Sequence, residues 1–291
     1  MFRVGDRMSR LDRGLSDTDP ETERAHIELL RRAAPGRRLR LALSLSRTVM
    51  SLSRRGLADR LRDASPEEVG LRFVALHYGA RLADELRAEL AARRAMTDPD
   101  LLAALAPVLR VLGVLGVRHF VGGSIASSAH GVARASVDGD VVAELTAAHV
   151  GPFVDALRDD YYVPEERIRD AVPRRGSFNL IHLDTMLKVD VFVSRDRPFD
   201  RRAFERSRPA SIEGAGGATL PISSAEDVIL AKLEWYRRGG EVSERQWTDV
   251  MGVLRASEGA LDLPYLRGGS AELGVSDLLE RALAEADRAS S

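Results

Sequence analysis

Two aspartates one residue apart, Asp138 and Asp140, follow a glycine-serine pair, Gly123-Ser124, in the stretch FVGGSIASSAHGVARASVDGD. On a β-strand both carboxylates point the same way, roughly 7 Å apart along the backbone. Carboxylates so placed can share a pair of divalent cations, which hold the attacking and leaving oxygens of a phosphoryl displacement. Mg²⁺ suits this chemistry because it takes few carboxylates and leaves room for substrate phosphates. The alternative is a turn and a solvated loop that happen to be neighbours.

A third acid lies in the apolar segment LKVDVFV, where Lys188, Asp190 and Phe192 share one face of a predicted strand. A charged pair on an apolar strand is costly unless it is paired or bound to something. Asp190 therefore either completes the metal site or forms an ion pair with Lys188 on that face.

Phosphate-binding groups are also present. Backbone N–H groups at the start of the helix predicted after Ser124 suit an anion. Lys188 and Lys232 are the only lysines in the chain. On a helix, Lys232 has apolar and aromatic neighbours three and four residues away, so it lies on the apolar face. A lysine there either extends to solvent or reaches into a site.

Three further charged residues have a functional and a structural interpretation. Arg134 lies four residues before the first aspartate and faces either a triphosphate or the surface. Asp227 forms a capping pair with Ser224 that needs no catalysis. Asp249 is one helical turn from Arg245, with which it could form an ion pair.

In this order the motifs resemble those of the nucleotidyltransferase superfamily, whose fold is that of DNA polymerase beta. Gly123-Ser124, thirteen residues, then Asp138-Gly139-Asp140 is similar to its G-S…D-x-D motif. The later motifs most resemble the AbiEii-type branch, which includes toxins of toxin–antitoxin and phage-defence systems. Three segments carry this second likeness: K-x-D at Lys188–Asp190, D-x4-K at Asp227–Lys232, and Asp249 on a following helix. The resemblance covers about residues 100–285.

The resemblance implies a Mg²⁺-dependent nucleotidyltransferase that moves a nucleoside monophosphate from an NTP to a hydroxyl, with RNA or tRNA favoured as acceptor and a protein second. It implies two Mg²⁺ ions on Asp138, Asp140 and Asp190, the last also positioning or deprotonating the attacking hydroxyl. It implies phosphate contacts from Gly123, Ser124, Lys188 and Lys232, to which Arg134 is added by position, with Asp227 and Asp249 in support. A toxin-like enzyme would also have a cognate antitoxin as partner.

One position departs from the superfamily pattern. The residue between the paired aspartates is usually apolar and branched, and here it is Gly139. We expect this glycine to remove a packing group beneath the sheet and loosen the strand, at a cost of roughly 0.5–1 kcal/mol for glycine itself. The alternative function is therefore a catalytically weak or inactive nucleotide- or partner-binding module with the same fold.

These groups must be positioned by helices and strands, and the order in which those elements are expected along the chain predicts an α/β (α+β) fold, with a mixed sheet flanked by helices. Strands are expected over 119–121, 138–140, 178–182 and 187–193, with a hairpin around Gly214–Gly217. Helices are expected over 19–32, 37–62, 66–94 and 101–115, then over short segments near 149–158 and 164–171 and from Ser224 onward. We predict a flexible tail (1–18), a helical N-terminal domain (19–96), the α/β core (97–222) and a C-terminal helical region (223–291).

Composition narrows the class of protein. The 291 residues are 44% hydrophobic and 30% charged, which is typical of a soluble globular protein. The absence of cysteine excludes disulfides, thiolate metal sites and thiol nucleophiles. The sequence has no membrane helix and no signal peptide, so we expect no membrane association and a cytoplasmic location.

A basic stripe runs from Arg31 to Arg55. Between Leu29 and Ala58 there are eight arginines and no acid: Arg31, Arg32, Arg37, Arg38, Arg40, Arg47, Arg54 and Arg55. Such a stripe could neutralise the phosphates of an RNA partner. The alternative is a solvated helical face, or one paired with acids from elsewhere in the fold.

Overall fold

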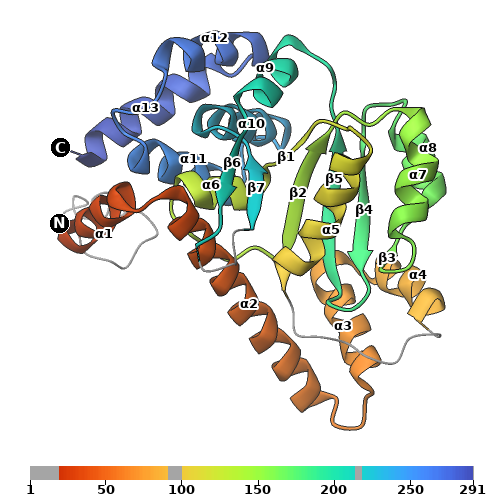
Figure 1. Cartoon of the computed structure of the whole chain (residues 1–291). Coiled ribbons are helices and arrows are strands. Elements are labelled where there is room, and N and C mark those ends of the chain that lie inside the picture. Colours follow the sequence, from red (N-terminus) through yellow and green to blue (C-terminus); the bar gives the residue numbers. More distant parts are fainter. Residues whose placement is uncertain (1–19, 91–99, 214–217, 291) are drawn as a thin grey trace, which may run out of the picture.

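The computed structural model describes residues 20–90, 100–213 and 218–290 (Figure 1). The tail predicted over residues 1–18 and the GAGG turn lie outside these ranges, as does the first part of the predicted core domain, residues 97–99. The division into four segments stays a prediction.

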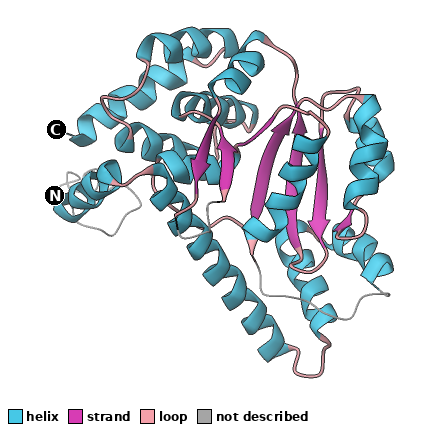
Figure 2. Ribbon diagram, viewed as in Figure 1, coloured by secondary structure: helices cyan, strands magenta, loops and turns pink. Residues whose placement is uncertain are grey.

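The described strands form one mixed sheet in the order β3-β4-β5-β2-β1-β7-β6 (Figure 2). They are β1 (His119–Val121), β2 (Asp138–Ala143), β3 (Tyr161–Tyr162), β4 (Ser177–His182), β5 (Leu187–Val193), β6 (Arg208–Ser211) and β7 (Thr219–Ile222). The β2–β5 and β1–β7 pairs are parallel, and the other pairs are antiparallel. The predicted mixed sheet is confirmed, and so is the antiparallel pairing expected around GAGG.

Helices flank this sheet, which confirms the predicted α/β (α+β) class (Figure 1). The first six are α1 (Pro20–Arg32), α2 (Pro35–Arg60), α3 (Pro66–Tyr78), α4 (Ala80–Leu90), α5 (Leu101–Val114) and α6 (Gly123–His130). The later ones are α7 (Ala147–Leu157), α8 (Glu165–Ala171), α9 (Pro198–Arg206), α10 (Ala225–Arg238), α11 (Glu244–Ala256), α12 (Leu263–Leu273) and α13 (Ser276–Ser290).

The single helix expected over 66–94 is wrong, because the chain breaks between α3 and α4 at Gly79. This residue has a φ of 102°, a backbone conformation that glycine adopts without steric cost. The predicted start of α3 is confirmed, since the side chain of Ser65 accepts a hydrogen bond from the backbone N–H of Glu68 at 3.1 Å. Helix α9 and the short strand β3 were not predicted.

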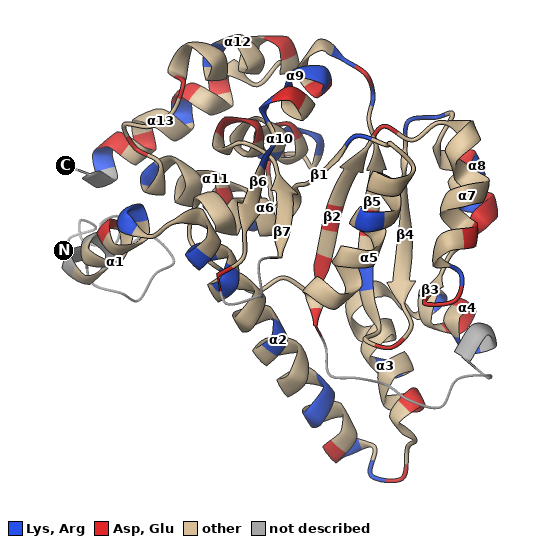
Figure 3. Cartoon of the chain, viewed as in Figure 1, with Lys and Arg blue, Asp and Glu red and all other residues tan. Residues whose placement is uncertain are grey.

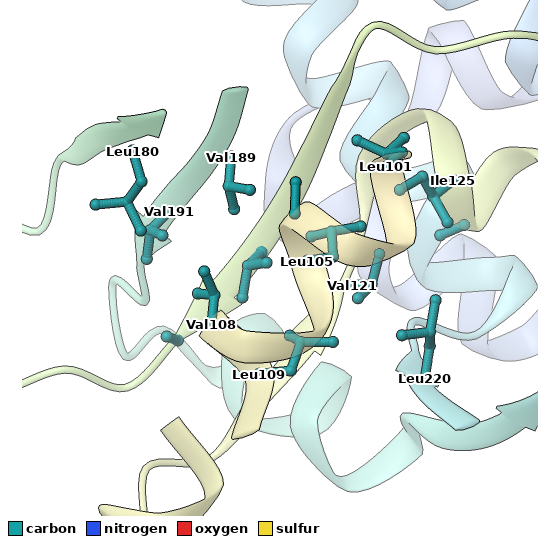
Figure 4. Close-up of a cluster of buried hydrophobic side chains, with 14 of the residues drawn as sticks. Leu101, Leu105, Val108, Leu109, Val121, Ile125, Leu180, Val189, Val191 and Leu220 are labelled. Carbon is teal, nitrogen blue, oxygen red and sulfur yellow. The ribbon is translucent and has the colours of Figure 1, made fainter. Parts of the chain in front are cut away.

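One face of the sheet packs against α5, whose side chains meet those of β5 and β1 (Figure 4). The expected gap beneath Gly139 is filled. A Cβ at Gly139 would lie 2.7 to 2.9 Å from the side-chain carbons of Leu105, which is fully buried on α5. The prediction of a missing packing group is therefore wrong, because a leucine from another helix occupies the space.

The basic stripe lies on α1 and α2 (Figure 3). Arg31 pairs with Glu258, and Arg47 lies 2.5 Å from Asp100. Arg38 is buried and donates to a backbone carbonyl at 2.9 Å. At these positions the arginines are engaged within the fold, two of them by acids from elsewhere in the chain.

The N-terminal helices contribute to the same hydrophobic core as the sheet. Leu39, Met50, Phe73 and Leu86 are fully buried members of the cluster that also contains the strands β2 and β5. No helix within the described ranges is long and apolar enough to cross a bilayer.

Candidate active site

Three aspartates meet on the sheet face opposite α5. Strands β2 and β5 run parallel with Asp138 beside Lys188 and Asp140 beside Asp190. Neighbouring strands lie about 4.8 Å apart, and alternate residues share a face, so the four side chains form a compact square. The strand register therefore brings the Asp-x-Asp and Lys-x-Asp motifs side by side, as the sequence led us to expect.

The charge of Asp140 is offset only in part, by the more distant charges of Lys232 and Lys188. Among the described residues its carboxylate has no hydrogen-bond or ion-pair partner, whereas Asp138 and Asp190 both have one. Burial raises the pKa of Asp140 to about 6, and repulsion from Asp138 and Asp190 adds to this shift. A carboxylate that is largely shielded from water and has no such partner is costly, and a bound cation would relieve that cost.

Gly123 makes room for that carboxylate. It begins α6 with a φ of 53°, and a Cβ on it would lie 1.7 Å from Oδ2 of Asp140. A side chain at this position would therefore collide with the carboxylate. The glycine of the Gly123-Ser124 pair is explained by this close approach as well as by its backbone conformation.

Asp190 is held by two protein donors. Lys188 donates to its Oδ2 at 2.6 Å, and the amide of Asn179 on β4 donates to Oδ1. Lys188 also lies 3.6 Å from Asp138, whose other oxygen accepts from Ser136 at 3.1 Å. The ion pair considered as an alternative is thus formed. In the ranges that the structure describes, no three His, Cys, Asp or Glu side chains are grouped so that they could hold a metal ion, so Asp138, Asp140 and Asp190 share a face without forming a ready three-carboxylate site.

The environment of Lys188 keeps it charged. Burial alone would lower the pKa of this lysine, but Asp190 and Asp138 raise it above its ordinary value. Its Nζ also lies 5.6 Å from the centroid of the Tyr78 ring. The Tyr78 hydroxyl donates to the carbonyl of Val137 at 2.6 Å, so α3 supports both the lysine and the start of β2.

The second part of the site is a charged network at the start of α6. Arg134 donates to both oxygens of Asp249 at 2.7 Å and to Oγ of Ser124 at 2.7 Å. Lys232 from α10 donates to Oδ2 of Asp249 at 2.7 Å. The network therefore gathers two cations beside the N-terminus of a helix, where an anion is stabilised.

Asp249 is the centre of this network. Burial would raise its pKa, but the hydrogen bond from Arg134 and the charge of Lys232 hold it below its usual range. The pairing considered with Arg245 is not the one that forms. Lys232 is only 7% exposed, so it does not extend to solvent, and it lines the pocket described next.

A pocket of about 470 Å³ joins the two parts. Seven of the predicted residues line it: Gly123, Ser124, Arg134, Asp138, Asp140, Asp227 and Lys232. The other three do not line it, but Lys188 and Asp249 form ion pairs with lining residues, and Asp190 is the register partner of Asp140. All ten therefore belong to one region of the fold.

Asp227 is the residue with the strongest structural explanation. Its backbone N–H donates to Ser224 at the start of α10, and its carboxylate accepts from Ser224 at 2.7 Å and from the hydroxyl of Tyr265 at 2.5 Å. Burial raises the pKa of Asp227 despite these bonds. The capping role expected as the alternative is thus present.

Several contributing residues were missed in the sequence. Asn179 interrupts the apolar strand FNLIH, which is a usable signal, but its partner depends on strand register. Ser136 and Tyr78 give no comparable signal. Five further arginines line the pocket and come from segments scattered over loops and helices: Arg175, Arg195, Arg197, Arg238 and Arg245.

No protein-family model matches the chain, and no curated protein matches it. Among solved structures, the chain is similar to the antibiotic-resistance factor ANT(2'')-Ia, at 15% identity and a TM-score of 0.41, over 62% of this chain and 95% of that one. It is also similar to an antigenic nucleotidyltransferase-like protein from Paracoccidioides brasiliensis, at 16% identity and a TM-score of 0.38, over 63% and 92% of the two chains. At these TM-scores the likeness carries no argument, so the functional case rests on the side chains of the site.

Proposed function

We propose that this chain is a Mg²⁺-dependent nucleotidyltransferase that moves a nucleoside monophosphate from an NTP to a hydroxyl acceptor. One observation carries the proposal: the unpartnered carboxylate of Asp140 stands between Asp138 and Asp190 in the same pocket as Ser124, Arg134 and Lys232. Carboxylates that could bind a metal ion thus lie beside basic side chains that could bind phosphates, and transfer of a phosphoryl group requires both.

The carboxylates suit Mg²⁺. The ion prefers hard oxygen ligands, takes few of them from the protein, and would relieve the charge that raises the pKa of Asp140. Asp138 and Asp140 would hold it, and Asp190 would join them for a second ion once Lys188 turns toward phosphate. When bound, Mg²⁺ would neutralise charge on the transferring group and lower the pKa of the attacking hydroxyl.

The remaining residues would position the reactants. The start of α6, Ser124, Arg134 and Lys232 would bind the β- and γ-phosphates and stabilise the departing pyrophosphate. The acceptor oxygen forms a bond to the α-phosphorus as the bond to the bridging oxygen breaks, and Asp190 would accept the hydroxyl proton. Asp249 would set the positions of Arg134 and Lys232.

The acceptor and partners follow from the resemblance rather than from the site. RNA remains the favoured acceptor and a protein hydroxyl the second, with a cognate antitoxin as partner of a toxin-like enzyme. The stripe Arg31–Arg55 supports RNA less than its composition indicated, because Arg31, Arg38 and Arg47 are engaged within the fold.

A nucleotide-binding module without turnover is the second candidate. It is favoured by the two donors that hold Asp190, Lys188 and Asn179. Label transfer distinguishes the candidates: the protein is incubated with Mg²⁺, each α-labelled NTP and total RNA, beside an Asp138→Asn control. Label on RNA or protein with the wild type alone supports the enzyme. Nucleotide binding without transfer favours the module, and no binding refutes both.

A further inference from the structure

Beyond the carboxylates, the pocket continues to an aromatic end. Val142 and Phe192 are register partners on β2 and β5, two residues further along than Asp140 and Asp190 and on the same face. Phe120 on β1 is the other register partner of Val142. All three side chains line the pocket, so together they form an apolar floor beside the aspartates of the candidate site.

Trp235 forms a wall above this floor. It follows Lys232 by three residues on α10, a rise of about 4.5 Å, and both side chains line the pocket. The centroid of its ring lies 5.9 Å from that of Phe192. Yet 47% of Trp235 is exposed, which makes it one of the few large apolar side chains that the fold leaves uncovered at a pocket.

Polar groups suited to a planar heterocycle line the same pocket as the tryptophan. The guanidinium of Arg238 lies 5.8 Å from the centroid of its ring. Gln246 on α11 lines the same pocket, and its Oε1 is buried without a hydrogen-bond partner among the described residues. Arg238 also donates to Glu234 at 2.6 Å, so the amide of Gln246 is the group left to bond the edge of a base, while an exposed indole offers a face for stacking.

We propose that this aromatic end is the nucleobase subsite, with Trp235 as the stacking surface. The inference rests on the proposed function, because that function places the β- and γ-phosphates at Ser124 and Lys232. The α-phosphate then lies at the carboxylates, and the nucleoside extends past them over Val142 and Phe192. Stacking tolerates any base, so the subsite binds NTPs in general and leaves selection among them to edge contacts.

Tryptophan fluorescence tests this directly, because the chain has only two tryptophans, Trp235 and Trp247. Trp247 does not line the pocket and donates to Glu285 at 3.2 Å. In a Trp247→Phe background, the α,β-methylene analogue of ATP with Mg²⁺ should quench the emission of Trp235. Inorganic tripolyphosphate, which has the phosphates without a base, should bind and leave the emission unchanged.

Affinities measured by calorimetry provide the second readout. Trp235→Leu should weaken binding of the ATP analogue by about 5- to 100-fold and leave tripolyphosphate binding unchanged. Trp247→Phe should change neither affinity. Thermal unfolding of each variant checks that the fold is intact.

The outcomes separate the two proposals. Binding of the analogue without quenching, and with equal affinity in Trp235→Leu, would overturn the nucleobase subsite and leave the proposed function standing. Binding of neither analogue nor tripolyphosphate would refute the proposed function itself.

Discussion

Replacing Asp140 by asparagine should stabilise the free protein at neutral pH and abolish transfer. The carboxylate has a pKa of about 6 against an ordinary 3.8, because it is buried and lies beside Asp138 and Asp190. Two pKa units at 1.36 kcal/mol each correspond to roughly 3 kcal/mol of unfavourable charge. Burial is the largest cause of this shift and repulsion from the two other aspartates adds to it. An uncharged asparagine removes most of both costs, so we expect this variant to gain roughly 2–3 kcal/mol.

The gain should depend on pH in a defined direction. Between about pH 4 and pH 6 the folded wild type binds a proton at Asp140 that the unfolded chain has released. The contribution of Asp140 to the free energy of unfolding therefore falls as the pH rises through this window. The advantage of Asp140→Asn should be full above about pH 6 and disappear below about pH 4.

Urea unfolding at about pH 8 and about pH 4, without metal, measures this difference. Asp159→Asn, at an exposed position, is the matched control and should change neither value. Adding Mg²⁺ at about pH 8 should stabilise the wild type and leave Asp140→Asn unchanged, because ligand binding to the folded state adds to its stability. A variant less stable than wild type at about pH 8, or a gain independent of pH, would refute the assignment of an only partly offset charge to this position.

Three further changes test the supports of the site. Gly123→Ala should destabilise the protein by roughly 1–3 kcal/mol, as measured by urea unfolding, and lower transfer, because the added methyl meets Asp140 at a positive φ. Gly139→Ala should cost roughly 1–3 kcal/mol by overpacking, and Leu105→Val should recover part of that loss in a double-mutant cycle; additive effects would contradict the contact. Asp249→Ala should cost roughly 3 kcal/mol in thermal or urea unfolding, since it leaves a buried lysine unpaired, and a neutral result would contradict the network.

Local pattern predicted much of the architecture. The alternation of faces in DGD and LKVDVFV placed Asp138 with Asp140 and Lys188 with Asp190, because strand geometry fixes which side chains share a face. The Ser65 cap and the strands β1, β2, β4 and β5 followed from signals that span a few residues, whereas β3 was missed. The break at Gly79 was missed, because one glycine within a helical pattern is compatible with either outcome.

The local sequence pattern did not determine which residue each charged side chain would pair with. Asp249 had Arg245 within reach on its own helix, yet it pairs with Arg134, 115 residues away, and with Lys232. Such pairing depends on how α10 and α11 pack against α6, and no local spacing encodes it. The same is true of Asn179, whose amide reaches Asp190 only because β4 and β5 are neighbours.

The sequence by itself determined which residues could do phosphoryl chemistry and which faces of their strands and helices would carry them, because those properties depend on residue type and a short repeat. Only the tertiary structure decided that the Asp140 carboxylate has no hydrogen-bond or ion-pair partner among the described residues, that Leu105 fills the space beneath Gly139, and that Trp235 lines the same pocket as Asp140. Each of these results depends on the register and packing of segments distant in the chain, where the cost of burying charge and the exclusion of overlapping atoms select one arrangement.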